Sequence, residues 1–183
     1  MDFLKRQQGG KVMKDSELRM IETMLKKQDE LNSAIMKEFG LTTISKEQID
    51  MATLDEIGEF THELKGDWCW WKKTQPQVDE EKVLGELVDV WHFVLSYQNH
   101  FINGEKGIEY TCTFKRNSKN ILSLMRNHKF GLTVAFSDLV SWKWDKLERL
   151  TAITEYLGFT IEDVYQAYCG KNKINYQRLK EGY

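Results

Sequence analysis

Apolar residues recur along most of this chain at steps of three and four, which is the period of a helix with one buried face. The clearest run predicts a first helix over residues 16–39, with Gly40 as its C-terminal stop. The apolar positions of this run are Leu18, Ile21, Met24, Leu25, Leu31, Ile35 and Phe39. Ser45 and Gln48 form a capping-box pair that predicts the start of a second helix, which we expect to end at Gly66. The apolar stripe of this second helix consists of Met51, Leu54, Ile57 and Phe60.

Residues 78–101 form the most apolar of the predicted helices. Because apolar side chains from Val88 to Leu95 lie on nearly every side, we expect this helix to be central and most buried. The later pattern predicts a connection at 102–114, helices at 115–129 and 133–157, a stop at Gly158, a sixth helix from Thr160 to about Tyr168, and an interruption at Gly170. Pro76 is the only proline, and no sustained period-two alternation is present. The predicted fold class is therefore all-α, a multi-helix bundle.

Composition limits the partners of this bundle. A chain of 183 residues suits one domain over 1–183, with the polar residues 1–14 expected to form a loose leader. The 26 basic and 28 acidic residues give a net charge of −2, so no basic field is present to attract nucleic acid. No apolar run is long enough to span a membrane, and the chain begins without a signal-peptide core. The three cysteines lack zinc-site spacing, which favours reduced thiols in a cytoplasm.

Two pairs of acidic residues carry the main chemical signal. Glu56 and Glu59 are three residues apart in the second predicted helix, and Glu86 and Asp89 repeat this spacing in the third. Each pair therefore shares one helix face. Solvated faces are the alternative, because 28 acids make such pairs common by chance. An unpaired charge is costly in the apolar third helix, however, and four converging carboxylates repel one another unless a cation lies between them. Such oxygen ligands suit Mg²⁺ and a phosphate-bearing substrate.

Two further segments are candidates for a pocket beside these acids. Residues 67–76 contain three tryptophans and Lys72. They form either a lid of core aromatics or the wall of a nucleoside pocket, with the lysine near phosphate. Lys171, Asn175 and Arg178 share one face if their segment is helical. They are then either a solvated basic helix end or a set of phosphate ligands.

Single polar residues give weaker signals. Gln28 and Asn32 are amides one helical turn apart, which are either ordinary exposed residues or readers of the donor–acceptor edge of a base. His92 follows Asp89 by about one turn, although a core histidine with satisfied hydrogen bonds is the more ordinary interpretation. The histidines form no HExxH pattern, and no glycine-rich phosphate loop is present.

Together these motifs resemble the dimeric all-α dUTPases, within the MazG-like all-α NTP pyrophosphatase superfamily. The resemblance extends from about Leu25 to Tyr183 in the order of the family's motifs, although residues between about 102 and 158 are not matched individually. The segments that carry it are Gln28-Asp-Glu-Leu-Asn32, Glu56-Ile-Gly-Glu59, Trp68-Cys-Trp-Trp-Lys72, Glu86-Leu-Val-Asp89-Val-Trp-His92-Phe93, and a last motif with Lys171, Asn175, Arg178, Gly182 and Tyr183. Five motifs in sequence, with the tryptophan loop between the acid pairs, form a specific pattern.

The resemblance implies a bundle of the all-α NTP pyrophosphatase type that hydrolyses dUTP to dUMP and pyrophosphate, with dUDP as a further candidate substrate. It implies a cytoplasmic homodimer of the bacterial or phage type that uses Mg²⁺. The implied Mg²⁺ ligands are Glu56, Glu59, Glu86 and Asp89, with Glu56, or otherwise Glu59, orienting the attacking water. The implied phosphate ligands are Lys171, Arg178 and Lys72. The implied nucleoside contacts are Gln28, Asn32, Trp68, His92, Asn175 and Tyr183.

The sequence leaves two alternatives open. One is a pyrophosphatase of the same superfamily that acts on dCTP or other non-standard nucleotides, because uracil selectivity depends on details of the pocket. The other is a non-catalytic helical interaction protein. The intact acid pairs, the tryptophan loop and the basic C-terminal motif argue against this second alternative.

Overall fold

Helix α4 (Glu80–Tyr97) lies at the centre of the protein, as its apolar pattern predicts. Ten of its 18 residues are buried, and it packs against α1, α2, α7 and α8. The computed structural model describes residues 13–102, 111–127, 131–142 and 144–182. Within these residues the regular structure is helical throughout and includes no strand, which confirms the all-α fold class. The described helices include none with the length and apolar character required to cross a bilayer.

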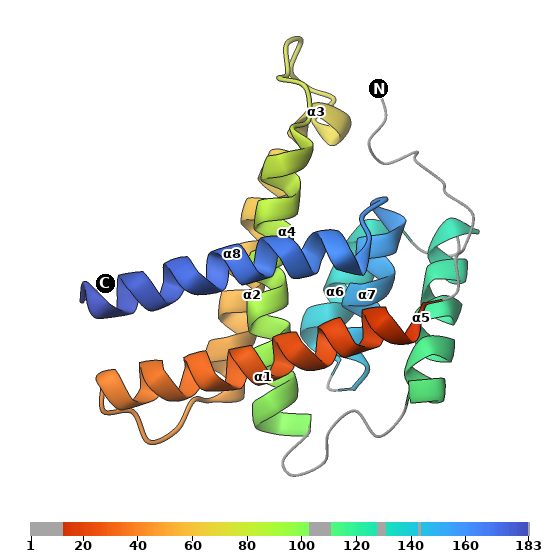
Figure 1. The fold of residues 1–183 in the computed structure, drawn as a ribbon. Coiled ribbons are helices and arrows are strands. Elements are labelled where there is room, and N and C mark those ends of the chain that lie inside the picture. The colour runs from red at the N-terminus through yellow and green to blue at the C-terminus, as the bar shows by residue number, and fades with distance from the viewer. Residues whose placement is uncertain (1–12, 103–110, 128–130, 143, 183) are drawn as a thin grey trace.

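The helix pair α2–α4 crosses the helix pair α1–α8. Helix α2 (Lys46–Glu63) packs along α4, and α1 (Asp15–Glu38) packs beside α8 (Ile161–Lys180). Figure 1 shows α1 and α8 passing over α4 on one side, while α2 lies on the other. The crossing therefore brings α2, α4 and α8 together, although they are far apart in sequence.

Three helices form a second group at the N-terminal ends of α1 and α8 (Figure 1). They are α5 (Thr111–Arg126), α6 (Leu132–Ser141) and α7 (Lys146–Tyr156), with α7 packed against α4, α5 and α6. A short π-helix, η2 (Gln98–Ile102), directly continues α4. Helix α5 corresponds to the helix predicted at 115–129 but begins four residues earlier, inside the segment predicted as a connection.

The two helix starts predicted from capping boxes are confirmed by their hydrogen bonds. The Gln48 N–H donates to Ser45 Oγ at 3.1 Å, and the Ser45 N–H donates to Gln48 Oε1 at 2.8 Å. Thr160 and Asp163 form the same reciprocal pair at the start of α8. These bonds satisfy N–H groups that the first turn of a helix leaves without partners.

The single helix predicted over 133–157 is wrong, because this segment contains both α6 and α7. Asp145 has a positive φ of 56°, a left-handed conformation that does not continue a right-handed helix. The buried Lys146 Nζ then donates to the carbonyl oxygens of Leu139 and Val140, at 2.5 and 2.8 Å. These bonds satisfy carbonyl groups at the end of α6 and stabilise the break. The spacing of apolar residues could not reveal this break, because it does not show that the Lys146 side chain bonds to the end of α6.

The interruption predicted at Gly170 is also wrong, because α8 continues through this residue to Lys180. Glycine inside a helix costs about 1 kcal/mol relative to alanine. The buried side chains of Tyr168 and Asn172 lie on either side of Gly170. Their packing, together with that of α8 against α1 and α4, offsets this cost.

The segment between α2 and α4 differs from the loop predicted at 67–76. Helix α2 ends at Glu63, before Gly66, and a short helix, α3 (Lys65–Trp68), follows at once. The chain after α3 returns against Gly66, where a Cβ atom would lie 2.6 Å from the carbonyl oxygen of Pro76. Glycine is therefore required at this close approach.

The leader expected at 1–14 falls mostly on residues 1–12, which lie outside the described part of the chain. Met13 is buried and belongs to the hydrophobic core, and Lys14 precedes the first residue of α1. The last two residues of this segment are therefore part of the bundle.

We predict opposite effects for alanine at two glycines. Gly66→Ala places a methyl group against backbone and should destabilise the protein by about 1–3 kcal/mol. Gly170→Ala, whose Cβ meets nothing within 4 Å, should stabilise it by about 0.5–1 kcal/mol. Chemical denaturation of both variants and the wild type measures these changes. A Gly66→Ala protein as stable as the wild type would contradict the close approach.

Candidate metal and nucleotide site

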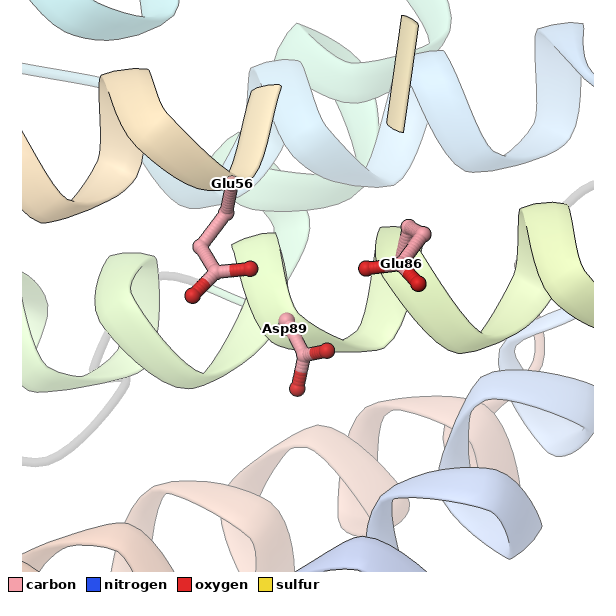
Figure 2. Close-up of side chains that lie close together, drawn as sticks. All are labelled: Glu56, Glu86 and Asp89. Atoms are coloured by element: carbon pink, nitrogen blue, oxygen red, sulfur yellow. The ribbon is translucent and has the colours of Figure 1, made fainter. Parts of the chain in front are cut away.

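Three carboxylates meet between α2 and α4. Glu56 extends from α2 toward α4, where Glu86 and Asp89 lie on one helix face (Figure 2). One oxygen of each carboxylate lies within 4.8 Å of the other two, and all three side chains are partly buried. Helical spacing thus places Glu86 and Asp89 together, and the packing of α2 on α4 adds Glu56.

Glu59 takes a different position from the other three predicted acids. It is exposed, and it lines an open acidic cleft of about 380 Å³ with Glu86. Its negative charge nevertheless raises the pKa of Glu56, Glu86 and Asp89. Glu59 therefore lies at the rim of the cluster and contributes to its electrostatic field.

The cluster resists full ionisation. Burial is the main cause that raises the pKa of Glu56 to about 7, and the charges of Asp89, Glu59 and Glu86 raise it further. Burial is also the main cause of the raised pKa values of Glu86 and Asp89. Each of these carboxyls is stabilised in its neutral form because water is partly excluded and like charges are close.

Helix α8 supplies positive charge to this cluster. Lys171 Nζ forms an ion pair with Asp89 and also donates to the Gly85 carbonyl oxygen at 3.3 Å. Arg178 lies two turns further along α8, and its charge lowers the pKa of Asp89. Because α8 is continuous, Lys171, the partly buried Asn175 and Arg178 share one face, as their spacing predicts for a helix.

The oxygen ligands of the cluster fit Mg²⁺. Octahedral Mg²⁺ binds oxygen at about 2.1 Å, so its ligand oxygens are at most about 4.2 Å apart. The carboxylate oxygens of Glu56, Glu86 and Asp89 lie within 4.8 Å of one another, so a small contraction would suffice. A divalent cation would also favour the ionised forms that the cluster otherwise opposes.

The predicted amides belong to a buried hydrogen-bond network beside the acids. Gln28 Nε2 donates to Asn32 Oδ1 at 2.9 Å, and Asn32 Nδ2 donates to Ser96 Oγ at 3.0 Å. His92 Nδ1 lies 2.7 Å from Gln28 Oε1, which also accepts the Tyr168 hydroxyl proton at 2.9 Å. Gln28 and Asn32 are therefore buried, unlike ordinary surface amides.

His92 occupies a position where it stays neutral. Burial, with a smaller effect of Lys171, lowers its pKa to about 3. Its ring stacks on Tyr168 with 4.4 Å between ring centroids. Its Nε2 atom is buried and has no hydrogen-bond partner among the described residues. Buried polar atoms without partners are uncommon, so His92 Nε2 keeps a hydrogen-bonding capacity that the described residues leave unused.

Trp68 lies on another side of the molecule. Its Nε1 donates to the Thr61 carbonyl oxygen at 2.8 Å, and its ring lines an apolar groove of about 640 Å³ between α2 and α6. This groove, which also includes Leu54 and Phe136, contains none of the clustered carboxylates. Lys72 is exposed in the segment between α3 and α4. The structure therefore does not bring Trp68 and the amides to one pocket within the chain.

Three members of the network were not identified from the sequence. Ser96 follows His92 by one helical turn, and this spacing is a signal that sequence reasoning could have used. Tyr168 and Asn172 come from α8. Tyr168 lies 140 residues after its partner Gln28. No local spacing could have linked them. Tyr183, a predicted nucleoside contact, lies outside the described residues.

This arrangement combines a helical bundle, a cluster of three carboxylates, a facing helix with basic residues and a buried polar network. A family model described as dUTPase matches residues 20–183. The chain therefore belongs to the all-α dUTPase family, which confirms the resemblance of its motifs and assigns it dUTP diphosphatase activity with dUTP as substrate. A search of curated proteins found no match.

The raised pKa of Glu56 predicts how the stability of the metal-free protein depends on pH. Folding shifts this pKa from 4.5 to about 7, so the folded state binds more protons than the unfolded state between these values. Stability should therefore fall as pH rises through this window and stay low above it. Glu56→Gln removes this contribution, so its Tm should exceed that of the wild type more at pH 8 than at pH 5. Thermal denaturation in EDTA measures the difference, and an equal Tm difference at both pH values would contradict it.

Proposed function

We propose that this protein hydrolyses dUTP to dUMP and pyrophosphate in a Mg²⁺-dependent reaction at the acidic cluster. The observation that carries the proposal is the approach of Glu56, Glu86 and Asp89 to within 4.8 Å, next to Lys171 of α8. Glu59 completes the proposed ligand set from the rim. dUDP, which offers the same base and one phosphate fewer, is a further candidate substrate.

In this proposal the carboxylates have two tasks. Glu86 and Asp89, with Glu56 and Glu59, hold Mg²⁺, which when bound neutralises phosphate charge and polarises the phosphoryl group. Glu56 also accepts a hydrogen bond from the attacking water and so orients it, with Glu59 as the alternative. Glu56 suits this task because it extends from α2 toward the acids of α4 (Figure 2).

The basic side chains would hold the triphosphate. Lys171 is already beside Asp89 and supplies a point charge, and Arg178 supplies a planar fork for phosphate oxygens. Lys72 is a further proposed phosphate ligand, contributed by the exposed segment after α3.

The buried network would bind the nucleoside. Gln28, Asn32 and His92 offer amide groups and one unpartnered ring nitrogen beside the acids. Asn175 and Tyr183 are proposed to complete the pocket from the C-terminal segment. Because Trp68 lines the groove between α2 and α6, we propose that it contacts nucleoside across a subunit boundary.

We further propose that the enzyme is a homodimer in the cytoplasm. The groove between α2 and α6 is bordered by large apolar side chains that are strongly exposed. Leu54 (50%) and Trp68 (39%) line the groove, and Met51 (60%) and Val134 (45%) are exposed on the same two helices, α2 and α6. An exposed apolar patch of this kind is typical of a protein–protein interface. Cys69 and Cys169 are free thiols, which is compatible with a reducing compartment.

Asp89→Asn tests the metal assignment. The variant should remain folded, because Asp89 is only partly buried, but should lose at least about 100-fold in kcat through the loss of a charged ligand. Calorimetry in the presence of a non-hydrolysable dUTP analogue should also show weaker Mg²⁺ binding by the variant than by the wild type. Glu81→Gln, an exposed carboxylate of the same helix, is the matched control and should behave like the wild type. Near-normal turnover by folded Asp89→Asn would exclude this site.

A substrate panel of dUTP, dUDP, dCTP, dTTP and UTP tests the base assignment, and poor turnover of dUTP would reject it.

Leu54→Arg tests the dimer interface. An arginine at the edge of the groove would place charge in the apolar contact and should raise the dimer Kd at least about tenfold. Light scattering coupled to gel filtration measures the mass. Leu124→Arg, at a comparably exposed leucine of α5, should leave the dimer intact. A wild-type protein that is monomeric at micromolar concentration would contradict the proposal.

A further inference from the structure

Lys171 already supplies a cation to the acidic cluster. Its Nζ forms an ion pair with Asp89 and donates to the Gly85 carbonyl oxygen at 3.3 Å, so two contacts hold the ammonium against α4. The charge of this ammonium lowers the pKa of Glu56 and Glu86 as well as that of Asp89. One lysine of α8 therefore acts on all three carboxylates of the cluster.

A divalent cation and the Lys171 ammonium would compete for Asp89. Both are attracted by the oxygens of the same carboxylate, and two positive charges beside one carboxylate repel each other. The divalent ion is the stronger competitor, because it carries twice the charge. Mg²⁺ also binds oxygen at about 2.1 Å, whereas an ammonium hydrogen bond to a carboxylate is roughly 2.8 Å long.

The side chain of Lys171 has room to leave Asp89. Its backbone is fixed within α8, which packs against α1 and α4, but 31% of the side chain is exposed to solvent. A lysine carries its ammonium on a flexible stem of four carbons, so the charge can turn away while the helix stays in place. Asp89 belongs to the central helix α4, and its side chain is only 22% exposed.

We propose that Lys171 is an exchangeable internal cation, which holds Asp89 until a divalent ion binds there and then moves to the phosphates of the substrate. The proposal rests on the proposed function for the positions of the metal and the phosphates. It goes beyond that function because it couples the two ligands through one side chain. Metal binding releases the positive charge that the triphosphate requires, so each ligand should strengthen the binding of the other.

Lys171→Met tests the competition through metal binding alone. Methionine keeps a long unbranched side chain and removes the charge. In calorimetry without nucleotide, the Kd of the variant for Mg²⁺ should be at least about fivefold lower than that of the wild type, because no ammonium competes for Asp89. Lys173→Met removes an exposed lysine of the same helix and should bind Mg²⁺ like the wild type. Equal or weaker binding by folded Lys171→Met would overturn the proposal.

NMR of the wild type follows the ammonium itself. The Nζ signal of Lys171 in protein with ¹⁵N-labelled lysine is assigned by its absence from Lys171→Arg, which keeps the positive charge. Addition of Mg²⁺ to protein prepared in EDTA should shift or broaden this signal, because the ammonium leaves Asp89. A non-hydrolysable dUTP analogue should then give Lys171 a third, distinct signal. A signal that saturating Mg²⁺ leaves unchanged would overturn the exchange, whatever the affinity of Lys171→Met.

Failure of the proposed function would be recognised separately. A wild type that binds Mg²⁺ neither alone nor with the nucleotide analogue would overturn the proposed metal site, and the exchange with it. Poor turnover of dUTP by a protein whose Lys171 signal responds to Mg²⁺ would overturn the substrate assignment and support the exchange.

Discussion

The candidate site depends on three carboxylates that the fold holds close together although their like charges repel one another. Glu56, Glu86 and Asp89 are held together because α2 packs along α4, and α4 is anchored on its other side by α1 and α8. The packing energy of the bundle therefore maintains an arrangement that is unfavourable by itself, as is common at functional sites. The ion pair from Lys171 offsets only part of the cost of burial and charge repulsion, since the pKa values of all three carboxyls remain raised, mainly by burial. A divalent cation between these carboxylates would offset more of it.

A second polar layer lies directly beside this cluster. The amides of Gln28 and Asn32 are buried, and burying such groups is favourable only when their hydrogen bonds are satisfied. The network satisfies them through contacts that join α1, α4 and α8. It consequently ties the three crossing helices to one another and fixes the orientation of each member. The region where the helices cross therefore has two parts, the charged carboxylate cluster and the neutral hydrogen-bond network.

Much of this arrangement could be predicted from the sequence, since helical spacing indicated the acid pairs and capping boxes indicated the starts of α2 and α8. The errors have physical causes. The break at Asp145 depends on a left-handed residue and on the buried Lys146, neither of which changes the apolar period. Gly170 remains helical because packing outweighs its propensity. Tyr168 could not be found at all, because its partner Gln28 is 140 residues away and only the fold joins them.

Helix α2 presents different chemistry on two of its faces. Glu56 and Glu59 lie on the side toward the acids of α4, whereas Leu54 and Thr61 line the apolar groove. Each residue added to an α-helix rotates the remainder of that helix by about 100°. A one-residue insertion or deletion ahead of Leu54 would therefore carry the carboxylates away from α4 and the leucine away from the groove in the same step. A change of length within α2 would therefore disrupt the acidic cluster and the apolar groove together.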